Sequence, residues 1–373
     1  ADAVFERLVY GFHPYGMPQS GTPRTIAALT RDDFVQFHQR YFLPNNALLA
    51  IVGDLTTDRT ATPLVSNHFG REVGVDARFG LSQSVSGDLT VNTDFAQVEA
   101  DEQQVNLTRF SLFFPEKREF FLENQGTFGF GGAAVNAGAT TSDTPILFYS
   151  RRIGLNAGRA VPIDVGGRVT GRFGRYTLGA LNIQAGDDEA TASPSTNFTA
   201  ARLRRDIWRK STLGILFTGR SIAQDGRGRN ETLGLDGTFG FYDNLVINTY
   251  WAKTWTAGRT GHDHSYRAQL DYNGDRYGAQ AEHLVVGNDF NPEVGFVRRR
   301  NMERSFGHFR FSPRPRRMRS VRRLVSQGSF TYIENGQGRL ESRNTDAEAA
   351  IEYQNGDRPF VGYSDSYEFL PLP

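Results

Sequence analysis

The residues of this chain best suited to do chemistry lie between positions 94 and 126, where charged side chains and phenylalanines are closely interleaved. A buried charge without a partner is costly, so these charges must be paired or in contact with water. Because they alternate in sign, we expect ion pairs within the stretch. The candidate site is this charge cluster, which consists of Asp94, Glu99, Asp101, Glu116, Lys117, Arg118 and Glu119.

The charge cluster has two interpretations. It either forms a constriction that recognises a substrate or is a structural turn held by ion pairs. Ion-pair networks are common without catalysis, and we favour the structural turn. The acidic residues 94–103 lack the order of carboxylates found in an EF-hand loop. We therefore predict no calcium site there.

The other residue types argue against an enzyme. None of the seven histidines lies in an H-x-x-E-H or H-E-x-x-H arrangement, and the chain has no cysteine. It also has no G-x-S-x-G motif and no phosphate-binding P-loop. We predict no catalytic, metal-binding or cofactor-binding residue and no cofactor. The net charge of +1 gives no electrostatic argument for a nucleic-acid partner.

The first part of the chain reads as local α/β structure. Thr30 is a suitable N-cap, and two aspartates follow it where the helix dipole favours negative charge. Aromatic residues at three- and four-residue spacing then predict a helix to about Phe42, which Pro44 ends. The apolar run at 47–54 predicts a buried strand.

Residues 3–58 resemble the insulinase- or pitrilysin-type zinc peptidases. The resemblance rests on HPYGMPQSGT (13–22) and on IAALTRDDFVQFHQRYFLPNNALLAIVGDLT (26–56), which join a turn motif, a capped helix and a strand in order. In that family the zinc ligands lie N-terminal to the matching segment. The resemblance therefore implies a non-catalytic, peptidase-like fragment. The alternative is a zinc metallopeptidase whose catalytic half is missing from this chain.

From about residue 73 onward, the sequence predicts antiparallel β-structure. Hydrophobic residues make up 38% of the chain and the mean hydropathy is −0.47, which excludes a helical membrane protein. Apolar and polar residues alternate along 79–92, 211–220 and 231–241, and each range predicts one strand. Turn residues such as Asn273-Gly274 and Asn355-Gly356 indicate a meander of hairpins.

Two architectures produce this pattern, a soluble sandwich or propeller and a transmembrane barrel. We favour the barrel because the strands are about ten residues long, whereas soluble strands average about five or six. Their polar face is rich in Gly, Thr, Ser and Asp, as expected for a barrel interior. Aromatic residues also gather at the expected strand ends, where an interfacial belt would lie. These residues are Tyr242, Trp251, Trp255, Tyr266, Tyr272 and Tyr277.

The β-rich part of the chain is similar to a family of bacterial outer-membrane β-barrels of unknown function. The similarity rests on residues 89–128, on LFYSRRIG (147–154) and on GNDFNPEVGFVRR (287–299). It implies a strand at 106–114 and, at 115–126, a turn and following segment at the barrel rim. The family's carbohydrate-binding-like module is absent, and its chains continue past the point where this one ends. We therefore expect an incomplete barrel.

The sequence thus predicts a mainly β protein, an antiparallel up-and-down transmembrane β-barrel with a small α/β N-terminal segment. We expect a non-enzymatic protein of a Gram-negative outer membrane, in contact with its lipid, for passage or docking of a glycan or peptide. A soluble all-β binding protein is an alternative, as is the peptidase. The predicted divisions are an α/β segment at 1–58, a linker at 59–70 and the barrel domain at 71–373.

Overall fold

The chain divides into two compact units, residues 1–70 and 71–373. The computed structural model describes residues 27–41, 55–58, 65–69, 74–93, 110–132, 143–156 and 159–370. Among these residues, no helix is long and apolar enough to cross a membrane.

The described residues of the first unit form one helix and one hairpin. The predicted N-cap is confirmed, because the Thr30 hydroxyl accepts a hydrogen bond from the Asp33 N–H at 3.4 Å. The Asp33 carboxylate accepts one from the Thr30 N–H at 2.8 Å, which completes a capping box. The predicted strand at 47–54 lies outside the described residues. The described elements of this unit are α3 (Arg31–Tyr41), β1 (Leu55–Asp58) and β2 (Val65–Phe69). Of these, β2 falls in the predicted linker.

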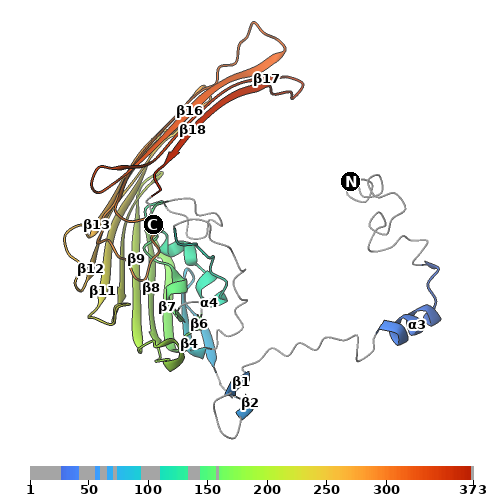
Figure 1. Cartoon of the computed structure of the whole chain (residues 1–373), viewed down its shortest axis with the longest axis vertical. Helices are drawn as coiled ribbons and strands as arrows, with labels where there is room; N and C mark the ends of the chain where they lie inside the picture. Colours follow the sequence, from blue (N-terminus) through green and yellow to red (C-terminus); the bar gives the residue numbers. More distant parts are fainter. Residues whose placement is uncertain are drawn as a thin grey trace. The chain divides into compact units, whose positions relative to one another are not determined.

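The second unit is built on one antiparallel sheet of 14 strands (Figure 1). Within this sheet, strands that follow one another along the chain are hydrogen-bonded neighbours. The predicted meander is therefore confirmed. The strands are β3 (Val75–Ser82), β4 (Val85–Thr93), β7 (Ile163–Phe173), β8 (Tyr176–Ala185), β9 (Thr196–Trp208), β10 (Ser211–Arg220), β11 (Asn230–Phe241), β12 (Leu245–Thr256), β13 (His264–Asn273), β14 (Tyr277–Val286), β15 (Met302–Phe311), β16 (Val321–Asn335), β17 (Leu340–Tyr353) and β18 (Phe360–Glu368).

The sheet has two distinct ends. At the end that we call the turn end, most connections are short, whereas most at the opposite loop end are longer. The last strands are an exception, because 312–320 at the turn end is longer than 336–339 at the loop end. The other turn-end connections include 83–84, 174–175, 209–210, 242–244 and 274–276, and the other loop-end connections include 186–195, 221–229, 257–263 and 287–301.

Two strand predictions are confirmed and one is wrong. The ranges 211–220 and 231–241 correspond to β10 and β11. The range 79–92 is instead a hairpin of β3 and β4. Phe79 pairs with Gly87 in this hairpin, and residues of the same parity face each other throughout most of it. The alternation therefore continues across the turn, which hid the turn from the sequence pattern.

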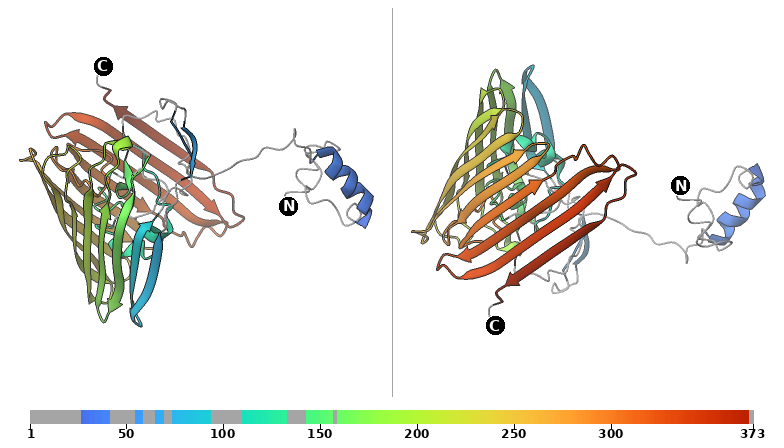
Figure 2. Two further views of the ribbon diagram at one scale, coloured as in Figure 1. Left: turned by 90° about the horizontal axis from the view of Figure 1, so that it is seen from below. Right: turned by 90° about the horizontal axis from the view of Figure 1, so that it is seen from above.

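The predicted barrel is not closed by the described residues. The sheet is open, with β3 at one edge and β18 at the other. It is strongly curved, as Figure 2 shows. The described residues 110–114 also do not form the predicted strand. Their backbone has no regular structure, because they belong to a segment that fills the concave side of the sheet.

This inner segment consists of residues 110–132 and 143–156, which pack on the inner, concave face of the sheet (Figure 1). Phe128 and Phe148 lie at its centre, with their ring centroids 4.7 Å apart. The hydrophobic core lies between these rings and buried strand residues such as Ile183, Leu216 and Leu284. The short elements on or near this face are α4 (Glu119–Leu122), η3 (Gln125–Phe128), η4 (Ser150–Arg152), β5 (Leu155–Asn156), β6 (Arg159–Ala160) and η5 (Glu189–Thr191).

Two glycines of the inner face allow the inner segment to approach the sheet closely. A Cβ added to Gly234 of β11 would lie 2.5 Å from the Phe130 ring, and one added to Gly179 of β8 would lie 2.9 Å from Thr127. Carbon atoms at optimal separation are about 3.5 to 4.0 Å apart. Packing therefore requires glycine at both positions.

Gly234→Val should displace the Phe130 ring and lower the free energy of unfolding by about 1 to 3 kcal/mol, as overpacked cores do. Tryptophan fluorescence during urea unfolding of the full chain in detergent measures this change. The matched control is Gly307→Val in β15, where an added Cβ meets no atom within 4 Å. Equal effects of the two substitutions would contradict the packing role of Gly234.

Candidate functional site

The predicted charge cluster contains one buried ion pair, between Glu116 and Arg118. The Arg118 Nη2 lies 2.8 Å from the Glu116 Oε2, and the two side chains are 1% and 2% exposed, respectively. The Arg118 Nε also donates to the Glu116 Oε1 at 2.9 Å. This bidentate geometry is the strongest form of an arginine–carboxylate pair.

The surroundings satisfy the remaining polar atoms of this pair. The Ser150 hydroxyl donates to the Glu116 Oε2 at 2.6 Å. Arg118 donates to the carbonyl oxygens of Ser150 and Ile153 at 2.8 Å and 2.6 Å. Burial raises the pKa of Glu116, but the hydrogen bonds and charge of Arg118 outweigh it and lower that pKa below its ordinary value. The pair thus ties the 115–118 turn to η4, which supports its structural interpretation.

The two other described residues of the predicted cluster, Lys117 and Glu119, are less buried than this pair. The Lys117 side chain is half-buried and the Glu119 side chain is exposed at the start of α4. The backbone N–H of Lys117 donates to the Glu116 Oε1 at 3.0 Å. Asp94, Glu99 and Asp101 lie outside the described residues. Their expected pairing with Lys117 and Arg118 therefore stays a prediction.

The phenylalanines of the inner segment lie next to arginines. The Arg118 guanidinium carbon lies 4.2 Å from the Phe121 ring centroid, and that of Arg168 lies 5.0 Å from Phe120. Phe110 has two such neighbours, from the 287–301 connection. Cation–π contacts of this kind contribute about 0.5 to 2 kcal/mol each. They explain why phenylalanines and charges are interleaved in this stretch.

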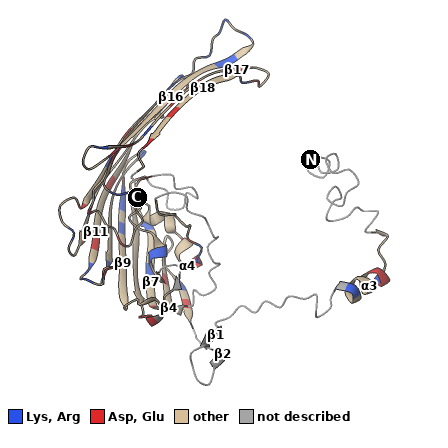
Figure 3. Cartoon of the chain, viewed as in Figure 1, with Lys and Arg blue, Asp and Glu red and all other residues tan. Residues whose placement is uncertain are grey.

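Buried ion pairs on the inner face hold the inner segment to the sheet. Arg202 of β9 makes a bidentate pair with Asp236 of β11, at 2.6 and 2.9 Å. The same carboxylate accepts a hydrogen bond from the Gly131 N–H of the inner segment at 3.1 Å. Arg267 of β13 donates to the Gly131 carbonyl at 3.0 Å and to Glu282 at 2.6 Å. Figure 3 shows such charged residues within the strands.

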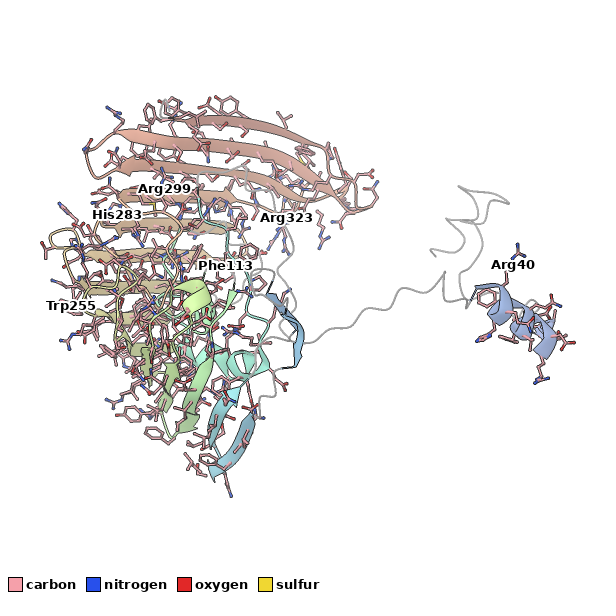
Figure 4. The ribbon with its side chains drawn as sticks, turned by 60° about the horizontal axis from the view of Figure 1, so that its bottom comes forward. Arg40, Phe113, Trp255, His283, Arg299 and Arg323 are labelled. Carbon is pink, nitrogen blue, oxygen red and sulfur yellow. The ribbon has the colours of Figure 1, made fainter. Side chains whose placement is uncertain are left out.

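A second group of charged residues lines a pocket of about 330 Å³ at the loop end. Three arginines come from η4 and from the 287–301 connection, and Glu293 is the acidic residue among the lining side chains. In Figure 4, Arg299 and Trp255 mark the loop end of the strands, and Arg323 lies toward the turn end. The polar lining residues of the pocket are Ser111, Arg152, Gln224, Asn291, Glu293, Arg298 and Arg300.

The Glu293 carboxylate is already held by other groups. Its Oε2 accepts a hydrogen bond from the Gln224 N–H at 2.7 Å, and its Oε1 accepts one from the Asn291 amide at 3.0 Å. The Arg220 guanidinium lies 4.0 Å away. The carboxylate is therefore fixed within the wall of the pocket and partly neutralised there.

Sequence reasoning missed this pocket as a site. Arg152 belongs to LFYSRRIG (147–154) and Arg298 to GNDFNPEVGFVRR (287–299), two motifs that served only to establish a resemblance. Arg300 directly follows the second motif. The structure brings the two motifs together through an antiparallel bridge between Ile146 and Phe296. Paired arginines in two separate motifs were the available signal, but nothing in the sequence shows that the motifs touch.

No group of three or more histidine, aspartate or glutamate side chains within the described ranges is arranged to hold a metal ion.

A comparison with protein families finds one match. Residues 58–165 match the model of a domain of unknown function, DUF5916. This range contains the inner segment and the first strands of the sheet. The description names neither a location nor an activity, so the similarity to outer-membrane barrels stays a prediction.

Known proteins similar to parts of this chain carry the name "uncharacterized zinc protease". ML0855 of Mycobacterium leprae is 34% identical over 67 residues, which are 18% of this chain and 15% of that protein. Rv2782c of Mycobacterium tuberculosis is 25% identical over 105 residues, which are 28% of this chain and 24% of that protein. The chain thus spans less than a quarter of the length of either relative. This partial similarity agrees with the predicted peptidase-like resemblance.

Glu116→Gln should destabilise the protein by about 3 kcal/mol at neutral pH, because it removes the charge of the buried carboxylate that pairs with Arg118. In the unmodified chain, the lowered pKa of Glu116 contributes stability above the ordinary glutamate pKa of about 4.3. That contribution is lost as the pH falls through the lower pKa of the folded state. The variant should therefore lose less stability than the unmodified chain on acidification.

Urea unfolding of the full chain in detergent at pH 7 and pH 3 measures both effects. Glu119→Gln is the control, because Glu119 is exposed and its substitution should change stability by less than about 0.5 kcal/mol. The stabilising role of the Glu116–Arg118 pair would be contradicted if Glu116→Gln left the stability unchanged. It would also be contradicted if the variant lost as much stability on acidification as the unmodified chain.

Proposed function

We propose that residues 71–373 are the larger part of a non-enzymatic bacterial outer-membrane β-barrel that docks a polar ligand such as a glycan or peptide. In this proposal, the outer face of the sheet contacts lipid. The inner segment occupies the barrel interior, and the loop end faces the ligand.

The observation that carries the proposal is an apolar row on the outer face. Leu203, Ile215, Leu235, Trp251 and Tyr266 are successive register partners on β9 to β13. Their side chains are 37% to 47% exposed. A sheet in water turns its apolar face toward the core, whereas this sheet leaves a continuous apolar row uncovered. A lipid-facing surface has this composition.

The opposite face supports the same proposal. Buried arginines and carboxylates lie there, as with Arg202 at 2% exposure and Glu282 at 7%. On β16 to β18, which the described inner segment does not cover, the inner face is polar and lines a groove of about 390 Å³. A wet, polar interior opposite an apolar outside is typical of outer-membrane barrels. The groove residues include His308, Gln327, Ser329, Asp346, Glu348 and Ser364.

The ends of the strands give further support. Trp208, Tyr242, Tyr272 and Tyr277 are exposed near the turn end, where an interfacial belt would lie. Trp251 lies mid-strand instead, within the apolar row. The turn end and the loop end also fit the short periplasmic turns and longer extracellular loops of bacterial barrels.

The open edges impose a requirement on this proposal. Unpaired backbone groups are not tolerated in the hydrocarbon region, so β3 and β18 must be hydrogen-bonded to strands outside the described sheet. The β18 edge exposes large apolar side chains, with Val361 76% exposed and Tyr363 63% exposed. Such an edge is prone to pair with a further strand.

The similarity to uncharacterized zinc proteases favours a second candidate function, that of a peptidase component. None of the seven histidines of the chain lies in a zinc-binding H-x-x-E-H motif. A peptidase activity would therefore need zinc ligands from outside this sequence, either from a missing catalytic half or from a partner. Peptide hydrolysis by the purified chain alone would overturn the non-enzymatic proposal.

Leu235→Arg should impair folding into phospholipid vesicles by about 2 to 4 kcal/mol, the cost of an arginine on the lipid face near the bilayer midplane. If water covered this exposed position, the cost would stay within about 0.5 kcal/mol. Urea titration of the vesicle-bound full chain measures the difference.

Met318→Arg is the control, because Met318 is exposed in the 312–320 connection and outside the strands. Equal stabilities of the two variants, together with release of the protein from membranes by carbonate, would refute the barrel and favour a soluble all-β binding protein.

A further inference from the structure

The pocket at the loop end carries more positive than negative charge. Arg298 lies 3.5 Å from Asp143, and Arg220 lies 4.0 Å from Glu293. Glu293 is the acidic residue that lines the pocket, and Asp143 lies beside it as the partner of Arg298. Among the described residues, no carboxylate lies within ion-pair distance of Arg152, and the same holds for Arg300.

Arg152 and Arg300 are held in place by neutral groups. The Arg152 Nε donates to the Gly295 carbonyl at 3.2 Å, and the Arg300 Nη2 donates to the Asn291 side-chain oxygen at 2.6 Å. Among the described residues, these two are the acceptors for the Arg152 and Arg300 side chains. Each guanidinium has five N–H groups, so most of its N–H groups are not used by these bonds. Both side chains remain accessible to solvent. Their other N–H groups are therefore available to a ligand.

The arginines also act on one another electrostatically. Arg300 keeps contact with solvent, yet the surrounding protein displaces part of its hydration and lowers its pKa. The charges of Arg259 and Arg152 lower this pKa further, and Glu293 opposes them only in part. The pocket thus gathers like charges, which an anion would relieve.

We propose that this pocket binds the phosphate group of a ligand, with Arg152 and Arg300 as the principal donors. A phosphate monoester carries a charge of about −1.5 to −2 at pH 7, which matches two uncompensated guanidinium groups. Arginine forks fit phosphate oxygens in a bidentate manner. The proposal deepens the docking function proposed above and rests on it for the ligand class, a phosphate-bearing glycan.

The size and position of the pocket fit such a ligand. Its volume of about 330 Å³ exceeds what a phosphate group alone requires and lies at the lower end of the range for small-molecule sites. A neighbouring pocket of about 630 Å³ shares Arg152 and Gln224 with it. That second pocket has room for the sugar to which the phosphate is attached.

The first test uses inorganic phosphate as the probe and the full chain in detergent micelles. Calorimetric titration at constant ionic strength, with chloride as the competing anion, should show saturable binding. The double variant Arg152→Gln/Arg300→Gln should bind phosphate at least 10-fold more weakly. Arg316→Gln/Arg317→Gln removes the same charge from the exposed 312–320 connection and should leave the affinity unchanged.

Three outcomes would overturn the proposal. The first is that phosphate does not bind to the unmodified chain, and the second is that both double variants lose phosphate affinity equally. The third is that Arg300→Lys keeps the full affinity of the unmodified chain. The lysine variant keeps the charge but not the fork, and it provides the test if the double variant does not fold. Because this titration needs no bilayer, its failure is distinguishable from failure of the outer-membrane proposal.

A second titration separates the possible sources of the phosphate group. Glucose 1-phosphate in solution tests a soluble glycan, and vesicles that contain lipid A test a phosphorylated lipid headgroup. We expect glucose 1-phosphate to bind more tightly than inorganic phosphate. Binding to the lipid A vesicles alone would overturn the assignment to a soluble glycan.

Discussion

The fold of the second unit depends on the pairing of buried arginines on the inner face of its sheet. Arg168, Arg202 and Arg267 lie where a soluble sheet would place its apolar core. Each is paired with a carboxylate of the sheet and also contacts the inner segment through a backbone carbonyl or an aromatic ring. Removing either kind of partner would leave a buried charge uncompensated. The inner segment is therefore part of the electrostatic structure of the sheet as well as part of its hydrophobic core.

This arrangement has a consequence for the opposite face. Side chains along a strand alternate between the two faces, so polar residues on the inner face leave the outer face to apolar ones. The row from Leu203 to Tyr266 follows directly from the register that aligns Arg202 and Asp236 for their ion pair. A slip of one residue would exchange the two faces completely. The ion pairs and the apolar row therefore specify the same register.

The loop end differs from the rest of the inner face in its balance of charge. Along the strands, the arginines meet carboxylates at close range, and the inner segment supplies their remaining acceptors. At the loop end, Arg152 and Arg300 are positioned by a carbonyl and an amide oxygen instead. These contacts fix the directions of the guanidinium groups without neutralising them. A pre-organised positive pocket of this kind costs little further reorganisation when an anion binds.

Much of the fold was determined by local sequence. The helix cap at Thr30, the strands β10 and β11, and the Asn355-Gly356 turn all follow from alternation and from turn chemistry that a few adjacent residues express. The sequence pattern did not reveal the turn of the hairpin at 79–92, because apolar and polar residues keep alternating in the same order across it. The partners of the inner segment were decided only by the tertiary structure. Arg168 and Phe120 lie far apart in the chain, as do Arg152 and Gly295, and no periodicity links residues that meet only when a sheet curves around a segment.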